Sequence, residues 1–146
     1  GPEGGHGAHF ILDEALHDVL FSNPSIAVCT DGSAGIRHPR STGTYAKLFE
    51  RYVREKGMLS VEQAVHKATG IPARIIRFDD RGVIKLGAKA DLVLFDVAKV
   101  HATSTYVDPF KFAEGFDVVV VNGQVARENG VLQPGRHGRV LRSGRR

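Results

Sequence analysis

Apolar residues recur at helical spacing through the first half of the chain. The pattern predicts a helix over residues 13–22. It predicts a second helix along a stripe that Gly57 closes, made of Tyr45, Leu48, Phe49, Tyr52 and Val53. Ser60 and Gln63 are spaced as a capping box, so a third helix should begin there. We expect that helix to end at Gly70 and to bury Val61, Ala64, Val65 and Ala68.

Residues 26–29 are a short apolar run between turn residues. Four apolar residues without alternation favour a strand buried on both faces, as in a parallel sheet, with Cys29 in the core. Such a strand needs neighbours to satisfy its backbone groups, and the first half of the chain offers no second strand–helix unit. We therefore expect this chain to be one piece of a larger protein, completed by residues before Gly1 or by another chain.

The second half has a different pattern, with short apolar runs separated by glycine turns. Asn122-Gly123 stands between two of these runs and favours the type I′ turn of a hairpin. Residues 1–80 are thus predicted to be α/β and residues 81–146 mostly β. The strands are expected at residues 83–84, 92–95, 118–121 and 124–127.

Composition narrows the class of protein. Of 146 residues, 42% are apolar and 25% charged, which is typical of a globular chain. No apolar run approaches the roughly 18 residues of a membrane span, and the N-terminus lacks the features of a signal peptide. Cys29 is the single cysteine, which excludes an intrachain disulfide and makes the cytoplasm the expected location.

The net charge of +4 comes from the C-terminal tail. Residues 136–146 hold five arginines, and the rest of the chain holds 15 basic and 16 acidic residues. The tail contains no aromatic residue, whereas nucleic-acid binders usually interleave basic and aromatic side chains. A solvated tail is therefore favoured, nucleic acid is not expected as a partner, and an anionic partner stays open as the alternative.

Asp31 is the strongest candidate for a catalytic or metal-binding residue. It directly follows the predicted strand of residues 26–29, and catalytic side chains gather where parallel strands end. A carboxylate at that place can act as a general base or a metal ligand. The alternative is that Asp31 only caps the following Gly32 turn through its own backbone.

The loop His38-Pro39-Arg40 is the second candidate. Arginine presents a planar fork that suits a carboxylate, and the proline stiffens the loop. A plain surface loop with a solvated arginine is the alternative. The seven histidines form no compact metal motif, and only His6 and His9 lie three apart. A complete zinc site within this chain is therefore not expected, because zinc needs three or four converging ligands.

Taken together, four stretches resemble the C-terminal third of amidohydrolase-superfamily enzymes: residues 27–33, His38-Pro39-Arg40 with Gly43-Thr44, residues 82–96 and residues 118–123. The His-Pro-Arg loop points to the N-acyl-D-amino-acid deacylase (D-aminoacylase) branch. The resemblance implies that residues 1–80 are the last strand and helices of a metal-dependent (β/α)8 barrel. Residues 81–146 would then belong to a small β-sandwich domain with a basic tail.

The resemblance also implies a chemistry. One or two zinc ions would activate water for hydrolysis of an N-acyl amino acid. Asp31 would take the proton of that water, and in some members the same residue also contacts a metal. Arg40 would bind the substrate α-carboxylate, with His38 and Ser33 in the same substrate-binding set. The family's histidine ligands would lie upstream of Gly1, so we expect this chain alone to be inactive.

Two other functions remain open on the sequence. The first keeps the superfamily but changes the substrate to a cyclic amide or a dipeptide. The second is a non-catalytic interaction module with a basic tail. On the favoured interpretation the partners are a small N-acyl amino acid and the remainder of the enzyme, with no membrane.

Overall fold

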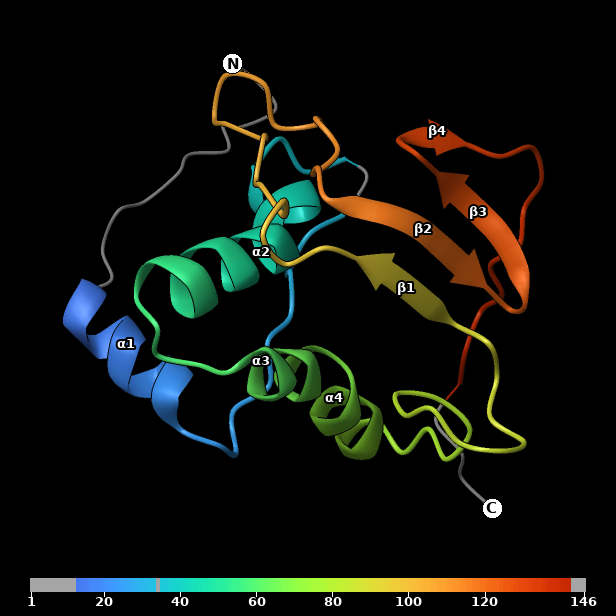
Figure 1. The fold of residues 1–146 in the computed structure, drawn as a ribbon, viewed down its shortest axis with the longest axis horizontal. Coiled ribbons are helices and arrows are strands. Elements are labelled where there is room, and N and C mark those ends of the chain that lie inside the picture. Colours follow the sequence, from blue (N-terminus) through green and yellow to red (C-terminus); the bar gives the residue numbers. More distant parts are fainter. Residues whose placement is uncertain (1–12, 34, 143–146) are drawn as a thin grey trace, which may run out of the picture.

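The computed structural model describes residues 13–33 and 35–142. Helices gather on one side of the molecule and a four-stranded sheet lies on the other (Figure 1). The helices are α1 (Glu14–Ser22), α2 (Arg40–Lys47), the π-helix η1 (Leu48–Glu55), α3 (Val61–Ala68) and α4 (Gly70–Ile75). The strands are β1 (Leu92–Phe95), β2 (Phe116–Val121), β3 (Gln124–Glu128) and β4 (Val131–Leu132). No helix in this described part is long and apolar enough to cross a membrane.

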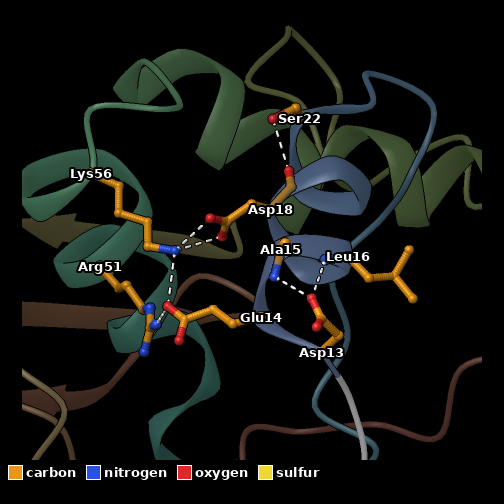
Figure 2. Close-up of polar contacts among 8 residues, drawn as sticks. All are labelled: Asp13, Glu14, Ala15, Leu16, Asp18, Ser22, Arg51 and Lys56. Atoms are coloured by element: carbon orange, nitrogen blue, oxygen red, sulfur yellow. Dashed lines mark hydrogen bonds and ion pairs between the residues drawn. The ribbon is translucent and has the colours of Figure 1, made fainter.

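Helix α1 confirms the first predicted helix. Ion pairs join it to η1. The Asp13 carboxylate caps the helix by accepting from the backbone of Ala15 and Leu16. Lys56 Nζ donates to both carboxylate oxygens of Asp18, at 2.6 and 2.7 Å, and to Glu14 at 3.1 Å (Figure 2). Glu14 also pairs with Arg51. The apolar side chains Leu16, Val19 and Leu20 stay exposed.

The second predicted helix is a continuous rod that changes type at Leu48. Helix α2 runs directly into η1, where Lys56 N donates to Arg51 O, five residues back, at 2.8 Å. Gly57 follows with φ +60°, a left-handed conformation that ends the helix as predicted. The predicted stripe is confirmed at its centre, because Leu48, Phe49 and Tyr52 are buried.

The capping box of α3 is confirmed in both directions. Ser60 N donates to the Gln63 side chain at 2.8 Å, and Gln63 N donates to Ser60 Oγ at 3.2 Å. The predicted end is off by two residues: α3 stops at Ala68 and Gly70 opens α4. The helix also buries Lys67, which lies at 3% exposure and was not on the predicted apolar face.

The predicted parallel strand at residues 26–29 is wrong for the described structure. These residues form no ladder, because no neighbouring strand is there to pair with them. Their polar backbone turns instead to α3, and Val28 N donates to Lys67 O at 3.0 Å. Val28 is buried as expected, whereas Cys29 is exposed and does not lie in the core.

The sheet is antiparallel throughout, in the order β1-β2-β3-β4. The β2–β3 hairpin is confirmed, and Asn122 (φ 50°) and Gly123 (φ 81°) both have the positive φ of a type I′ turn. Residues 83–84 are not a strand, which corrects that prediction. They have no partner strand among the described residues, and Ile84 is 92% exposed.

One apolar core joins the helices to the sheet. The ring of Phe49 lies 4.9 Å from that of Phe95, which lies 5.8 Å from Phe116. Val100, in the crossing between β1 and β2, is fully buried in the same cluster. Segment 97–102 is thereby held against η1, and this contact forms one wall of the site described next. The division of the chain at residue 80 into two domains stays a prediction.

Candidate functional site

The structure brings the two strongest candidate site residues, Asp31 and Arg40, into direct contact. Arg40 Nη2 lies 3.1 Å from Asp31 Oδ2, and Arg40 Nε donates to the Asp31 carbonyl oxygen at 2.9 Å. Arg40 is the first residue of α2, so the helix start fixes the origin of its side chain. The Asp31 carboxylate is 84% exposed and open to a ligand. A base and a cation thus stand side by side at one surface.

A tight turn presents Asp31 outward. Its φ of 44° is left-handed, a conformation that aspartate tolerates better than most residues. Gly32 N donates to Thr30 Oγ1 at 3.1 Å, which closes the turn. A Cβ at Gly32 would lie 2.6 Å from Ser41 Cα, so only glycine allows this close approach to α2.

His38 lies beside Arg40 and lines the groove described below, whereas Ser33 does not line that groove. Arg40 N donates to His38 Nδ1 at 3.1 Å, and the His38 ring meets Tyr106 edge-on with centroids 5.1 Å apart. Burial and the neighbouring Arg40 charge hold the pKa of His38 below its usual value, which favours the neutral imidazole. Ser33 is exposed outside the groove, and its carbonyl accepts from Ile36 N at 3.2 Å.

A groove of about 470 Å³ lies between the start of α2 and residues 102–106. Its walls include Arg40, His38, Lys47, Glu50 and Ser104. The two walls are closely joined, since a Cβ at Gly43 would lie 2.4 Å from Ser104 Oγ. Ser104 Oγ also donates to Pro39 O at 3.1 Å. The wall at 102–106 could not be predicted, because no sequence motif marks it and Ser104 lies 65 residues from its partner Pro39.

Glu50 anchors that wall to η1. Its carboxylate meets His101 Nδ1 at 2.5 Å and accepts from Ala102 N at 3.1 Å, with Arg54 at 3.9 Å. Burial opposes ionisation of Glu50, but the Ala102 N–H, His101 and Arg54 together hold its pKa below the usual value. Sequence patterns missed Glu50, because a glutamate within a helix is expected to face solvent.

Replacing Glu50 by glutamine should destabilise the chain by about 1–2 kcal/mol at neutral pH, since the bonds involve a charged group. The folded pKa lies below the unfolded value of 4.5, so this stabilisation is present above about pH 4.5. It is lost as the pH falls through the folded pKa, so the stability gap between variant and wild type should be smaller at pH 4 than at pH 7. Urea unfolding at both pH values measures the difference.

Glu55→Gln is the matched control, because Glu55 lies on the same helix and is exposed. Its effect should stay within about 0.5 kcal/mol. Equal stability of Glu50→Gln and wild type at neutral pH would show that Glu50 does not anchor the wall.

The described residues do not assemble a metal site. In residues 13–33 and 35–142 no three His, Cys, Asp or Glu side chains converge. Asp31 offers one accessible carboxylate and can therefore serve as a single ligand at most. His6 and His9 lie outside the described residues. A zinc centre that includes Asp31 must take its other ligands from elsewhere.

Comparison with known proteins places this geometry in context. The model of the amidohydrolase family matches residues 27–127. N-acyl-D-aspartate deacylase of Alcaligenes xylosoxydans xylosoxydans is 37% identical over 93% of this chain, and D-aminoacylase of the same organism is 34% identical over 91%. In each case the chain spans 28% of the relative's length.

Solved structures agree with the sequence relatives. A crystal structure of D-aminoacylase superposes with a TM-score of 0.86 at 33% identity, covering 92% of this chain and 29% of that one. N-acyl-D-glutamate deacylase from Bordetella bronchiseptica, complexed with zinc and a phosphonate inhibitor that mimics the tetrahedral intermediate, gives 0.79 at 36% identity. That match covers 90% of this chain and 28% of the other.

Proposed function

The chain belongs to the amidohydrolase family, and on that premise we propose that it is the C-terminal part of a zinc-dependent N-acyl-D-amino-acid deacylase. The complete enzyme would hydrolyse the amide bond of an N-acyl-D-amino acid to a carboxylate and a free D-amino acid. The observation that carries the proposal is the meeting of Asp31 with Arg40 at 3.1 Å. It supplies a proton acceptor beside a binding group for the substrate's own carboxylate.

Asp31 and Arg40 have separate roles in this proposal. Asp31 accepts a proton from the attacking water and returns it to the amine nitrogen as the C–N bond breaks. Arg40 binds the α-carboxylate with two parallel bonds and holds the amide over Asp31. The neutral His38 ring accepts the Arg40 backbone N–H and fixes the loop in place. Zinc, with Asp31 as one ligand and the others outside this chain, would polarise the amide carbonyl and activate the water.

The same proposal gives the chain its place in the whole enzyme. Residues 1–80 would be the last strand and helices of the (β/α)8 barrel, and residues 81–146 part of the small β-sandwich domain with its basic tail. The exposed apolar residues of α1 and of segment 83–86 support this, because a whole enzyme would cover them. The partner of this chain is then the remainder of the enzyme, working in the cytoplasm.

Assay of the full-length enzyme tests the proposal. N-acetyl-D-amino acids should be hydrolysed and their L-enantiomers should not, with release of the free amino acid as the readout. Chelation should abolish the activity and zinc should restore it. The 146-residue chain assayed alone should be inactive, because its described residues gather no zinc site. Faster hydrolysis of a cyclic amide or a dipeptide would instead assign a different substrate class.

A further inference from the structure

Lys67 is a buried charged side chain that pairs with no acidic residue among those the structure describes. It lies in the last turn of α3 and is 3% exposed. In the part of the chain that the structure describes, its Nζ donates to the carbonyl oxygens of Asn23 and, at 3.2 Å, Ile26. Burial lowers the pKa of Lys67. A buried ammonium held only by main-chain carbonyls is rare, and α3 would form equally well with an apolar residue there.

The backbone of Lys67 holds the same segment as its side chain. The Lys67 carbonyl is one of the last four in α3, which have no partner within the helix. It accepts from Val28 N at 3.0 Å. One residue therefore makes three hydrogen bonds to the segment 23–28, which passes beside α3 in Figure 1.

That segment leads directly to Asp31. Val28 is buried against the core, and Asp31 follows three residues later in its left-handed turn. Residues 26–30 have no strand ladder in the described structure, so the bonds to Lys67 set how far the segment extends and where its turn begins. A shift of the segment along α3 would carry the Asp31 carboxylate with it.

We infer that Lys67 is a positioning residue for Asp31: its buried ammonium and its backbone carbonyl hold the approach segment 23–28, and so place the proton acceptor. This rests on the proposed function, in which Asp31 accepts the proton. Lys67 contacts neither substrate nor reacting atoms, so its effect must pass through Asp31.

The test is Lys67→Met in the full-length enzyme, which keeps most of the unbranched side chain and removes the donor. A misplacement of about 1 Å can cost about 100-fold in rate, so kcat per folded molecule should fall by about 10- to 100-fold. KM should change less than kcat, because the main chain of Arg40 is placed by α2 and only its side chain bonds to Asp31. Lys67→Arg, which keeps a buried cation with donors, should recover most of the loss.

A double-mutant cycle distinguishes a role of Lys67 in positioning Asp31 from a role in stabilising the fold alone. Because Lys67 acts through Asp31, adding Lys67→Met to Asp31→Asn should lower kcat little further. Lys56→Met is the control, since Lys56 also forms partly buried polar contacts but attaches α1 instead. It should leave kcat within about threefold. If Lys67→Met does not fold, Lys67→Gln, with a shorter donor, should show the same split between kcat and KM.

The outcomes distinguish the two proposals. If Asp31→Asn leaves kcat intact, the proposed function fails. If Asp31→Asn abolishes activity but Lys67→Met keeps normal kcat per folded molecule, only the positioning role fails. Additive losses in the cycle, or an equal loss in Lys56→Met, would also overturn it.

Discussion

Asp31→Asn in the full-length enzyme should lower kcat by about 10²–10⁴-fold, the usual loss when a general base is removed. KM should change by no more than a few-fold, because proton transfer occurs in the transition state and not in substrate binding. Steady-state kinetics on an N-acyl-D-amino acid measures both constants.

The structure makes asparagine a clean replacement at this position. Asp31 has φ 44°, and asparagine tolerates the left-handed region as aspartate does. The bond from Arg40 Nε goes to the main-chain oxygen of residue 31 and persists in the variant. The ion pair that is lost joins an 84% exposed carboxylate, and such pairs contribute little to stability. A variant that folds normally and keeps its kcat would remove Asp31 from the reaction.

Arg40→Lys should raise KM for N-acyl-D-amino acids by about 10- to 100-fold, because lysine keeps the charge but loses the two-pronged contact with a carboxylate. An analogue whose α-carboxylate is amidated never forms that charged pair. Its KM should therefore change much less. The measurement is the KM of the variant and the wild type on both substrates.

Arg37→Lys provides the matched control for Arg40. Arg37 lies three residues earlier in the same loop, and its guanidinium sits over the Phe110 ring at 5.7 Å, outside the groove. Its replacement should leave both KM values nearly unchanged. Equal penalties on the two substrates in Arg40→Lys would show that Arg40 does not bind the carboxylate. The deacylase branch would then lose its local support in this chain, and the family assignment would remain.

Local signals in the sequence were sufficient for α1, for the start of α3 and for the β2–β3 hairpin. The Ser60–Gln63 capping box and the Asn122-Gly123 turn each depend on neighbours within a few residues, so the chain alone specifies them. The two strands that were predicted and not found, at residues 26–29 and 83–84, depend on more than local sequence. A strand exists only with a partner, and its own sequence cannot supply one.

The candidate site was predictable in part for the same reason. Asp31 and the His-Pro-Arg loop could be singled out because strand ends and arginine forks have a general chemical meaning, and the resemblance is confirmed by the family match. Glu50 and Lys67 could not, since contacts with distant segments partly bury Glu50 and fully bury Lys67. Lys67 did carry one usable sign. It lies three residues after Ala64, which is fully buried, and so falls next to the apolar face of α3.

Strand β1 has a hydrogen-bonded neighbour on one side only in the part of the sheet that is described, and its residues Leu92–Phe95 are all apolar. An open, apolar edge is a template on which a second molecule can add a strand. Association between copies then competes with correct folding, and it grows with concentration while folding does not. We therefore expect aggregation of this chain during overproduction to increase with its concentration.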